Sequence, residues 1–271
     1  MKIINGKKIA DRILADLKEK IKEEKTEPCL AIILVGKNPV SRLYVSIKEK
    51  ASKKIGIRIK KYILLSSSSE KSVLETINLL NNDSRVDGIL VQMPLPKHIS
   101  PDRVIQKINP KKDVDGFLLK SEFDPPFILA IWQSLKATRK ILKDKKIIAL
   151  VNSDIFGQRL SRFLKTKGLI VEYLKVKKDL RGDIISKIKL TDVLITVCGR
   201  PNLIKGLMIK SKAILIDGGI TKKNNQVIGD IDANDVKNKA GWLAPAPGGV
   251  GPITVALLLK NVLVSSQKAR F

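Results

Sequence analysis

The sequence is poor in residues that bind metals or form disulfides. Of its 271 residues one is His, two are Cys and 4% are aromatic. The two cysteines, Cys29 and Cys198, each lie in or at the end of an apolar strand-like run, far apart in the sequence. They offer neither metal-ligand spacing nor a disulfide framework, and we predict core thiols in a reducing compartment and no metal site. His98 lies in a Pro-flanked polar loop, which predicts a surface residue.

Long apolar runs are also missing. No run reaches the roughly 18 residues needed to cross a bilayer, and the start, MKIINGKKIA, has no signal-peptide core. We therefore expect a cytoplasmic protein that does not enter a membrane. Hydrophobic residues still make up 44% of the chain, which excludes a disordered or low-complexity protein.

Acidic residues are scarce: 26 Asp and Glu face 52 Lys and Arg, a formal charge of +26. Such a charge is typical of proteins that bind nucleic acid, and a basic nucleic-acid-binding protein stays open as one hypothesis. The lysines are scattered along predicted helix faces, however, and the few aromatics are not interleaved with them. This pattern argues against nucleic acid as a partner, and an anionic substrate or cofactor would suit the charge equally well.

Helical and strand-like periodicities alternate along the chain and predict an α/β fold with parallel sheets. Expected helices cover residues 7–25, 40–54, 70–81, 102–108, 127–140, 156–167 and 253–264. Expected strands cover residues 30–35, 57–64, 88–91, 147–151, 169–174, 193–197 and 213–217. Two α/β units meeting near residue 120, with a cleft between them for a ligand, fit this order best.

A helix predicted after the strand LAIILVG carries Ser41, Tyr44 and Lys48 at spacings of three and four, so they share one face. A lysine in a partly apolar cleft has a lowered pKa, which suits proton transfer, and Tyr44 could stack on a flat ring. Taken alone, a Lys and a Tyr on a helix face are more often ordinary solvated or core-edge residues.

Two further segments carry polar residues that could bind a ligand. Gln92 ends a buried strand, where ligands bind in open parallel sheets, although it could instead satisfy a turn. Asp113 and Asp115 precede Gly116; a carboxylate there could bind an amino-substituted heterocycle or simply its own backbone.

The turn APAPGGVGP precedes the last predicted helix. Its glycines Gly248 and Gly249, after Pro247, would let backbone approach a ligand closely, although the turn could also be a plain hinge between the units.

In their order and spacing, SRLYVSIKEKA, DGILVQMPLP, NPKKDVDGF, GDI and PGGVGPIT closely resemble the bifunctional methylenetetrahydrofolate dehydrogenase/methenyltetrahydrofolate cyclohydrolase (FolD) family over nearly the whole chain. The resemblance implies NADP-dependent oxidation of methylenetetrahydrofolate, with NAD also possible, and hydrolysis of the methenyl product to 10-formyltetrahydrofolate. It also implies a homodimer and a role in one-carbon metabolism that supplies purine, methionine and histidine biosynthesis. The implied domains are a folate-binding catalytic domain at 1–120, completed by the helix 252–271, and a Rossmann-like NAD(P)-binding domain at 121–251.

The same resemblance implies roles for individual residues. Lys48 would be the catalytic lysine of the cyclohydrolase, Tyr44 would pack against the folate, Gln92 would bond to and tune Lys48, and Asp115 would bind the pterin-like ring. Substrate would also meet Gln92 and the turn 247–249. The implied cofactor-binding residues are Val151, Asn152, Ser153, Gly157 and Ile220.

The sequence departs from the family in its second half. The family's phosphate-binding turn, roughly G-x-S-x-x-V-G-x-P, here has Val151 for its first Gly and Arg159 for its Pro. The family's P-C-T-P segment is shortened to DPPFILA, and its H-S/R-x-T segment is replaced by YLKVK at 173–177. Lys175, Lys177 or Lys178 could meet a ribose phosphate as point charges. These departures leave two enzyme hypotheses: a working bifunctional enzyme, or a cyclohydrolase that binds nicotinamide cofactors poorly.

Overall fold

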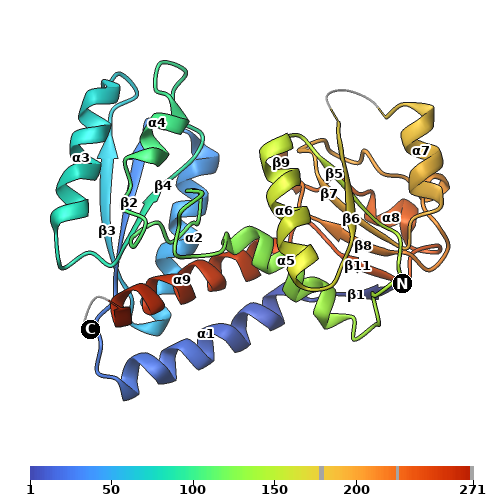
Figure 1. Cartoon of the computed structure of the whole chain (residues 1–271), viewed down its shortest axis with the longest axis horizontal. Coiled ribbons are helices and arrows are strands. Elements are labelled where there is room, and N and C mark those ends of the chain that lie inside the picture. The colour runs from blue at the N-terminus through green and yellow to red at the C-terminus, as the bar shows by residue number, and fades with distance from the viewer. Residues whose placement is uncertain (177–179, 224–225, 269–271) are drawn as a thin grey trace. The chain divides into compact units, whose positions relative to one another are not determined.

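The computed structural model describes residues 1–176, 180–223 and 226–268. Within it the chain forms two compact units (Figure 1). The three-stranded unit comprises residues 10–126 and 255–271, and the six-stranded unit comprises residues 1–9 and 127–254. This division differs from the predicted boundary at the N-terminus, because residues 1–9 group with the second half of the chain. The reason is strand β1 (Lys2–Ile3), which pairs in parallel with β11 (Trp242–Ala244).

The three-stranded unit is a parallel sheet in the order β3-β2-β4. Its strands are β2 (Cys29–Val35), β3 (Arg58–Leu64) and β4 (Gly88–Val91). Its helices are α2 (Pro39–Ile55), α3 (Glu70–Asn82) and α4 (Pro101–Gln106), with most of α1 (Gly6–Glu23) and α9 (Val250–Lys268).

Every residue of β2 is buried, because helices cover both faces of the sheet. Leu30 and Ile32 pack with α1, α2 and α9, whereas Ala31 and Ile33 pack with α3 and α4. Helices α2 and α3 accordingly lie on opposite sides of the sheet in Figure 1. The continuous apolar run LAIILV is therefore explained by two cores that share one strand.

Helix α9 is long and apolar enough to cross a membrane by length and composition alone, and 67% of its apolar window is buried. Its residues Leu258, Leu259 and Val262 lie in the same core as Leu30 and Ile32. The Asn261 side chain donates to the carbonyl oxygen of Val114 at 2.9 Å, and the Ser265 hydroxyl donates to that of Asp87 at 2.6 Å. These contacts make α9 a core helix of the three-stranded unit.

The six-stranded unit has a parallel sheet in the order β1-β11-β8-β7-β5-β6. Its further strands are β5 (Ile147–Val151), β6 (Val171–Lys175), β7 (Val193–Val197), β8 (Ile214–Asp217) and the antiparallel hairpin β9 (Thr221–Lys223) and β10 (Gln226–Ile228). Its helices are α5 (Pro126–Ala137), α6 (Asp154–Thr166), α7 (Gly182–Lys189), the 3-10 turn η1 (Gly206–Met208) and α8 (Ala233–Val236). The chain runs outward from β5 to β6 and then returns to β7 on the other side of β5. This reversal creates the crevice in which doubly wound folds bind dinucleotides.

The predicted α/β class with parallel sheets is confirmed. Strands β5 and β7 begin and end at the predicted residues. The prediction did not include β1, β11, α7, α8 or the β9–β10 hairpin. The strands among these are two or three residues long, which is too short to show a period.

Candidate active site

Helix α2 presents the predicted lysine. The Asn38 side chain caps the helix by accepting from the backbone N–H groups of Val40 and Ser41, and Pro39 occupies its first turn. Tyr44 and Lys48 follow on the same side and are both half-buried. A capped helix beside a buried strand is a rigid support for a reacting group.

Lys48 is held by Gln92. The Nζ of Lys48 donates to Oε1 of Gln92 at 2.7 Å, and Nε2 of Gln92 donates to the carbonyl oxygen of Met93 at 2.9 Å. The backbone N–H of Gln92 donates to the carbonyl oxygen of Ile33 at 2.9 Å, which extends the β2–β4 pairing by one residue. The buried hydroxyl of Ser41 also donates to Met93, at 3.2 Å. Ser41 shares a helix face with Tyr44 and Lys48, but its hydroxyl fixes the backbone beside Gln92.

The two aspartates before Gly116 have separate roles. The carboxylate of the fully buried Asp113 accepts from the backbone N–H groups of Phe117 at 3.2 Å and Leu118 at 2.8 Å. Asp113 thus holds its own turn together. Asp115 is half-buried, and its charge is coupled to that of Lys48.

The electrostatics of this cluster favour proton transfer. Burial lowers the pKa of Lys48, and the nearby Asp115 carboxylate partly opposes that shift. Burial raises the pKa of Asp115 to about 6, against the opposing effect of Lys48. Burial also raises the pKa of Tyr44 and keeps its phenol protonated. Both members of the lysine–aspartate pair are therefore shifted toward neutral pH, as in groups that exchange protons in catalysis.

The predicted substrate turn lies in the six-stranded unit. Gly248 has φ +100°, and a Cβ added there would meet no atom within 4 Å. The backbone N–H of Gly6 donates to the carbonyl oxygen of Gly248 at 2.9 Å, and a Cβ on Gly6 would lie 1.7 Å from the carbonyl oxygen of Gly249. Gly6 therefore supports this turn, a role that the sequence analysis missed although NGK at 5–7 marks a helix start.

The predicted cofactor residues gather at the carboxyl ends of β5 and β8. Ser153 caps α6, and Asn152 donates from Nδ2 to the carbonyl oxygen of Cys198, after β7, at 3.4 Å. Val151 is fully buried within β5, so its side chain lies in the core of the sheet and not in the turn. A Cβ on Gly157 would lie 2.4 Å from the Tyr173 ring, which is the close helix–strand packing that such folds reserve for glycine.

Ile220, 37% exposed, follows two glycines after β8. Beside it the structure reveals two buried carboxylates to which the sequence analysis gave no role. Asp217 accepts from the backbone N–H groups of Gly219, at 3.0 Å, and Ile231, at 2.9 Å. Asp230 accepts from that of Cys198 at 2.6 Å.

The Asp230 carboxylate also accepts from the backbone N–H of Arg200 at 2.6 Å. Burial raises the pKa of Asp217 to about 7 and also raises that of Asp230. An Asp at the end of an apolar strand, in LIDGG, and a second Asp in GDID were the available signals. Together these carboxylates shape the loops that follow β7 and β8.

Lysine stands where the ribose is recognised in dinucleotide-binding folds. Lys175 ends β6 and forms an ion pair with Asp154 in the first turn of α6. This pairing neutralises a carboxylate that would otherwise repel a phosphate at the helix N-terminus. Lys177 and Lys178, the other predicted contacts, lie outside the described residues.

The remaining sequence predictions concern isolated residues. Cys29 and Cys198 are free and buried, and burial raises the pKa of Cys198 to about 12, so its thiol is unreactive. His98 is exposed, and its ring nitrogen lies 3.0 Å from the carbonyl oxygen of Ser68. Among the described residues, no group of three or more His, Cys, Asp or Glu could hold a metal ion.

A doubly wound unit with a dinucleotide crevice, together with a unit that carries a buried lysine–amide–carboxylate cluster, defines an α/β enzyme of the nicotinamide-cofactor class. Family models agree: residues 4–115 match the tetrahydrofolate dehydrogenase/cyclohydrolase catalytic domain, and residues 125–270 match the NAD(P)-binding domain of the same family. The chain belongs to the tetrahydrofolate dehydrogenase/cyclohydrolase family.

Similar proteins support this membership along the whole chain. The "Bifunctional protein FolD" of Halothermothrix orenii is 38% identical over 276 residues, covering 97% of this chain and 96% of that protein. The crystal structure of the bifunctional enzyme FolD from Campylobacter jejuni has a TM-score of 0.92 at 36% identity and covers 100% of both chains. The Trypanosoma brucei methylenetetrahydrofolate dehydrogenase-cyclohydrolase, solved with NADP and an inhibitor, has a TM-score of 0.91 at 28% identity, covering 99% of this chain and 98% of that one. These matches favour an enzyme of folate one-carbon interconversion over a nucleic-acid-binding protein.

Proposed function

We propose that this enzyme oxidises methylenetetrahydrofolate by hydride transfer to NADP and then hydrolyses the methenyl product to 10-formyltetrahydrofolate, with Lys48 as the catalytic residue of the hydrolysis. The observation that carries the proposal is the 2.7 Å bond between Lys48 and Gln92, beside Asp115, in a half-buried position.

Lys48 acts by moving one proton. The oxygen of water bonds to the methenyl carbon, and its proton passes to the neutral amine of Lys48. When the ring C–N bond breaks, Lys48 gives that proton to the departing nitrogen, and the hydroxyl proton of the adduct is released to water. Burial supplies the neutral amine by lowering its pKa, and Gln92 holds the nitrogen in place.

The neighbours of Lys48 would bind and orient the folate. Asp115 would accept hydrogen bonds from the amino-substituted ring, a contact strengthened by its charge, and Tyr44 would pack on the flat ring system. Gln92 would also contact the substrate. The turn 247–249 would add backbone contacts, which the open space around Gly248 supports.

The six-stranded unit fits a dinucleotide. Gly199 has φ +68°, and a Cβ added there would find only Asn152 Nδ2, 4.0 Å away, so this backbone is open to a ligand. The N-terminus of α6, with Ser153 and Asn152 before it, would hold the pyrophosphate, and Ile220 would lie near the nicotinamide. NADP, when bound, supplies the acceptor for the hydride. Val151 would contribute through its strand backbone, and Gly157 by letting α6 approach β6.

The cation at the end of β6 favours NADP over NAD. An acidic residue at this position binds the ribose hydroxyls of NAD, whereas a cation accommodates the 2′-phosphate of NADP. Lys175 provides that cation, and Asp154 keeps it at the crevice. Titration of the protein with NADP and NAD, followed by the dehydrogenase assay with each, tests this preference. Failure of both cofactors would instead support the hypothesis of a cyclohydrolase without dehydrogenase activity.

The lysine assignment is tested with Lys48→Gln against Lys54→Gln, an exposed lysine on the same helix. General acid–base catalysis contributes roughly 100- to 10,000-fold, so Lys48→Gln should lower cyclohydrolase activity by at least about 100-fold. Its dehydrogenase activity should persist, and Lys54→Gln should retain both activities. Full cyclohydrolase activity in Lys48→Gln would overturn the assignment.

We also propose that the enzyme is a cytoplasmic homodimer. Its family membership supports this, and light scattering on the purified protein tests the dimer. A monomer at micromolar concentration would contradict it.

A further inference from the structure

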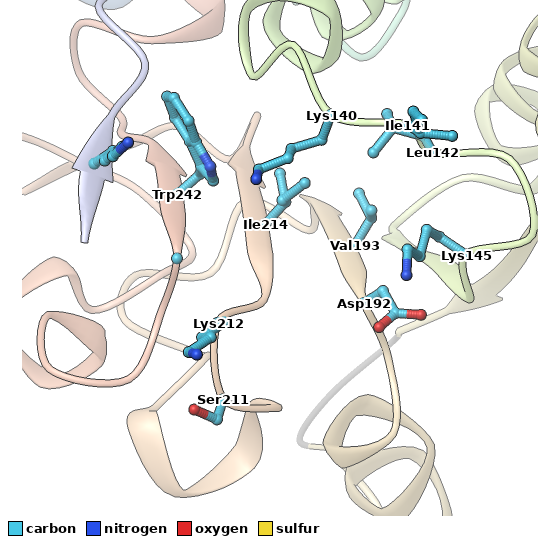
Figure 2. Close-up of a pocket in the computed structure, with 12 residues that line it drawn as sticks. Lys140, Ile141, Leu142, Lys145, Asp192, Val193, Ser211, Lys212, Ile214 and Trp242 are labelled. Carbon is cyan, nitrogen blue, oxygen red and sulfur yellow. The ribbon is translucent and has the colours of Figure 1, made fainter.

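A cavity lies within the six-stranded unit, at the end of the sheet where its parallel strands begin (Figure 2). It has a volume of about 430 Å³. Lys2, Val193, Ile214 and Trp242, which line it, are each the first residue of a strand. The predicted cofactor residues Val151, Asn152, Ser153 and Ile220 lie at or after the last residues of β5 and β8, so the two sites lie at opposite ends of the parallel strands.

The cavity combines an apolar wall with one flat aromatic ring. Leu142, Val193 and Ile214 are buried side chains, and the indole of Trp242 is partly exposed beside them. Figure 2 shows the Lys140 side chain extending across the cavity toward Trp242 and Ile214. A volume of this size lies in the range of small-molecule sites.

Four lysines line the cavity: Lys2, Lys140, Lys145 and Lys212. The ammonium of Lys2 lies 5.3 Å from the centroid of the Trp242 ring. Within the described part of the chain, no ion pair joins any of these four lysines to a carboxylate at 4.0 Å or less.

One carboxylate, that of Asp192, lines the same cavity, and its oxygens already have partners. Asp192 Oδ1 accepts from Lys210 Nζ at 2.8 Å, and Oδ2 accepts from the backbone N–H of Lys146 at 3.0 Å. These bonds lower the pKa of Asp192 and keep it ionised. Lys210 balances Asp192, and the charge of Lys145 also helps to lower the Asp192 pKa. Lys2, Lys140 and Lys212 therefore leave a local excess of positive charge in the cavity.

We propose that this cavity binds an anion that carries a flat aromatic ring, of the class of nucleoside monophosphates. The ring would stack on Trp242 against the apolar wall, and the phosphate would lie among the lysine ammonium groups, which bind phosphate as point charges. Lysines are scattered along most of the chain, and in this cavity they would gather around one ligand.

Adenosine 5′-monophosphate is the probe, and isothermal calorimetry on the full chain gives the affinity and stoichiometry. The test variant is Lys140→Ala/Lys212→Asn, because Asn tolerates the φ of +61° at position 212. The control, Lys165→Ala/Lys189→Ala, removes the same charge from exposed lysines of the same unit that do not line the cavity. Trp242→Leu removes the ring, and inorganic phosphate is a second probe that lacks one.

The wild type and the control should bind AMP alike, and Lys140→Ala/Lys212→Asn should bind at least tenfold more weakly. Trp242→Leu should weaken AMP binding, and phosphate should bind wild type at least tenfold more weakly than AMP. Equal affinity of the test and control variants would place AMP elsewhere, in the cofactor crevice for example, and would overturn the proposal. Absence of AMP binding, or equal affinity for AMP and phosphate, would also overturn it. Circular dichroism melting of each variant confirms that the compared proteins are folded.

Discussion

In the three-stranded unit, Lys48 and Gln92 hold each other through their side chains, whereas in the six-stranded unit Asp217 and Asp230 hold the backbone N–H groups of loops. A side-chain partner can be removed while the main chain keeps its own hydrogen bonds. A carboxylate that satisfies buried N–H groups cannot be removed without leaving them unpaired. Substitutions in the first unit should therefore change chemistry more than stability, and those in the second should change both.

The largest effect is expected at Gln92. Gln92→Leu removes the acceptor of Lys48, and cyclohydrolase activity should fall by about 100-fold because the amine loses its orientation. The melting temperature should change little, because the carbonyl of Met93 keeps its bond from Ser41. Kinetic assays and thermal melts measure both quantities, with the exposed Gln106→Leu as the control. A large loss of stability with activity retained would break the comparison.

Gln92→Glu tests whether the side chain at position 92 sets the pKa of Lys48. A carboxylate at 92 would raise the pKa of Lys48, so the pH profile of the hydrolysis should move to higher pH. A purely structural role for Gln92 would leave the profile where it is.

Replacing Asp230 should lower both the free energy of unfolding and the affinity for NADP. Asp230→Asn turns an amide NH₂ toward either the backbone N–H of Cys198 or that of Arg200, which costs about 3 kcal/mol of unfolding free energy. Affinity for NADP should fall as well, because the loop after β7 loses its anchor. The exposed Asp183→Asn should change neither quantity. An unaltered melting temperature in Asp230→Asn would contradict the backbone-holding role.

Stability should fall as the pH rises from 5 to 8. The pKa of Asp217 is raised to about 7, so between its unfolded value near 4 and this value the native chain binds more protons than the unfolded chain. One pKa unit corresponds to about 1.4 kcal/mol, so ionising Asp217 should cost about 3 kcal/mol between pH 5 and pH 8. Urea midpoints at successive pH values measure it. Asp217→Asn should lose the part of the slope that Asp217 contributes, and the raised pKa values of Asp115 and Asp230 should leave a smaller fall. Midpoints that are level or rise toward pH 8 in the wild type would disprove the prediction.

The smallest effect is expected at Gly157. Gly157→Ala places a methyl group 2.4 Å from an atom of the Tyr173 ring, and this overpacking should cost about 1 kcal/mol. Gly182→Ala, where an added Cβ meets nothing within 4 Å, is the matched control. Chemical denaturation compares the two, and equal stability would mean that α6 can retreat from β6 without cost.

Burial on both faces made parts of the fold predictable. Strand β5 is buried at every residue, so its apolar run is continuous and its bounds could be predicted from the sequence. Strands β1 and β11 span two and three residues, and their strand conformation depends on pairing with each other and with β8. Such pairings join residues far apart in the sequence, and no local pattern encodes them.

Site residues could be predicted from the sequence where both the residue type and its place in a helix or strand point to a ligand. Lys48 and Gln92 stand out as a helix-face lysine and an amide at a strand end, and the structure joins them. The local residue pattern did not separate Asp113 from Asp115, because the turn around Gly116 decides which carboxylate bonds its own backbone. The family resemblance alone singled out Asp115. Asp217 was missed because most of its partners are backbone N–H groups, which carry no signature in the sequence.

Helix α9 has a consequence for synthesis on the ribosome. The core of the three-stranded unit includes Leu258, Leu259 and Val262, which leave the ribosome only after residues 1–254. Domains generally fold as units, N-terminal regions first, during translation. Here the six-stranded unit, whose last residue is Thr254, can complete its own residues before the earlier-made residues 10–126 receive their final helix. The order in which the two units mature is therefore the reverse of the order in which most of their residues are made.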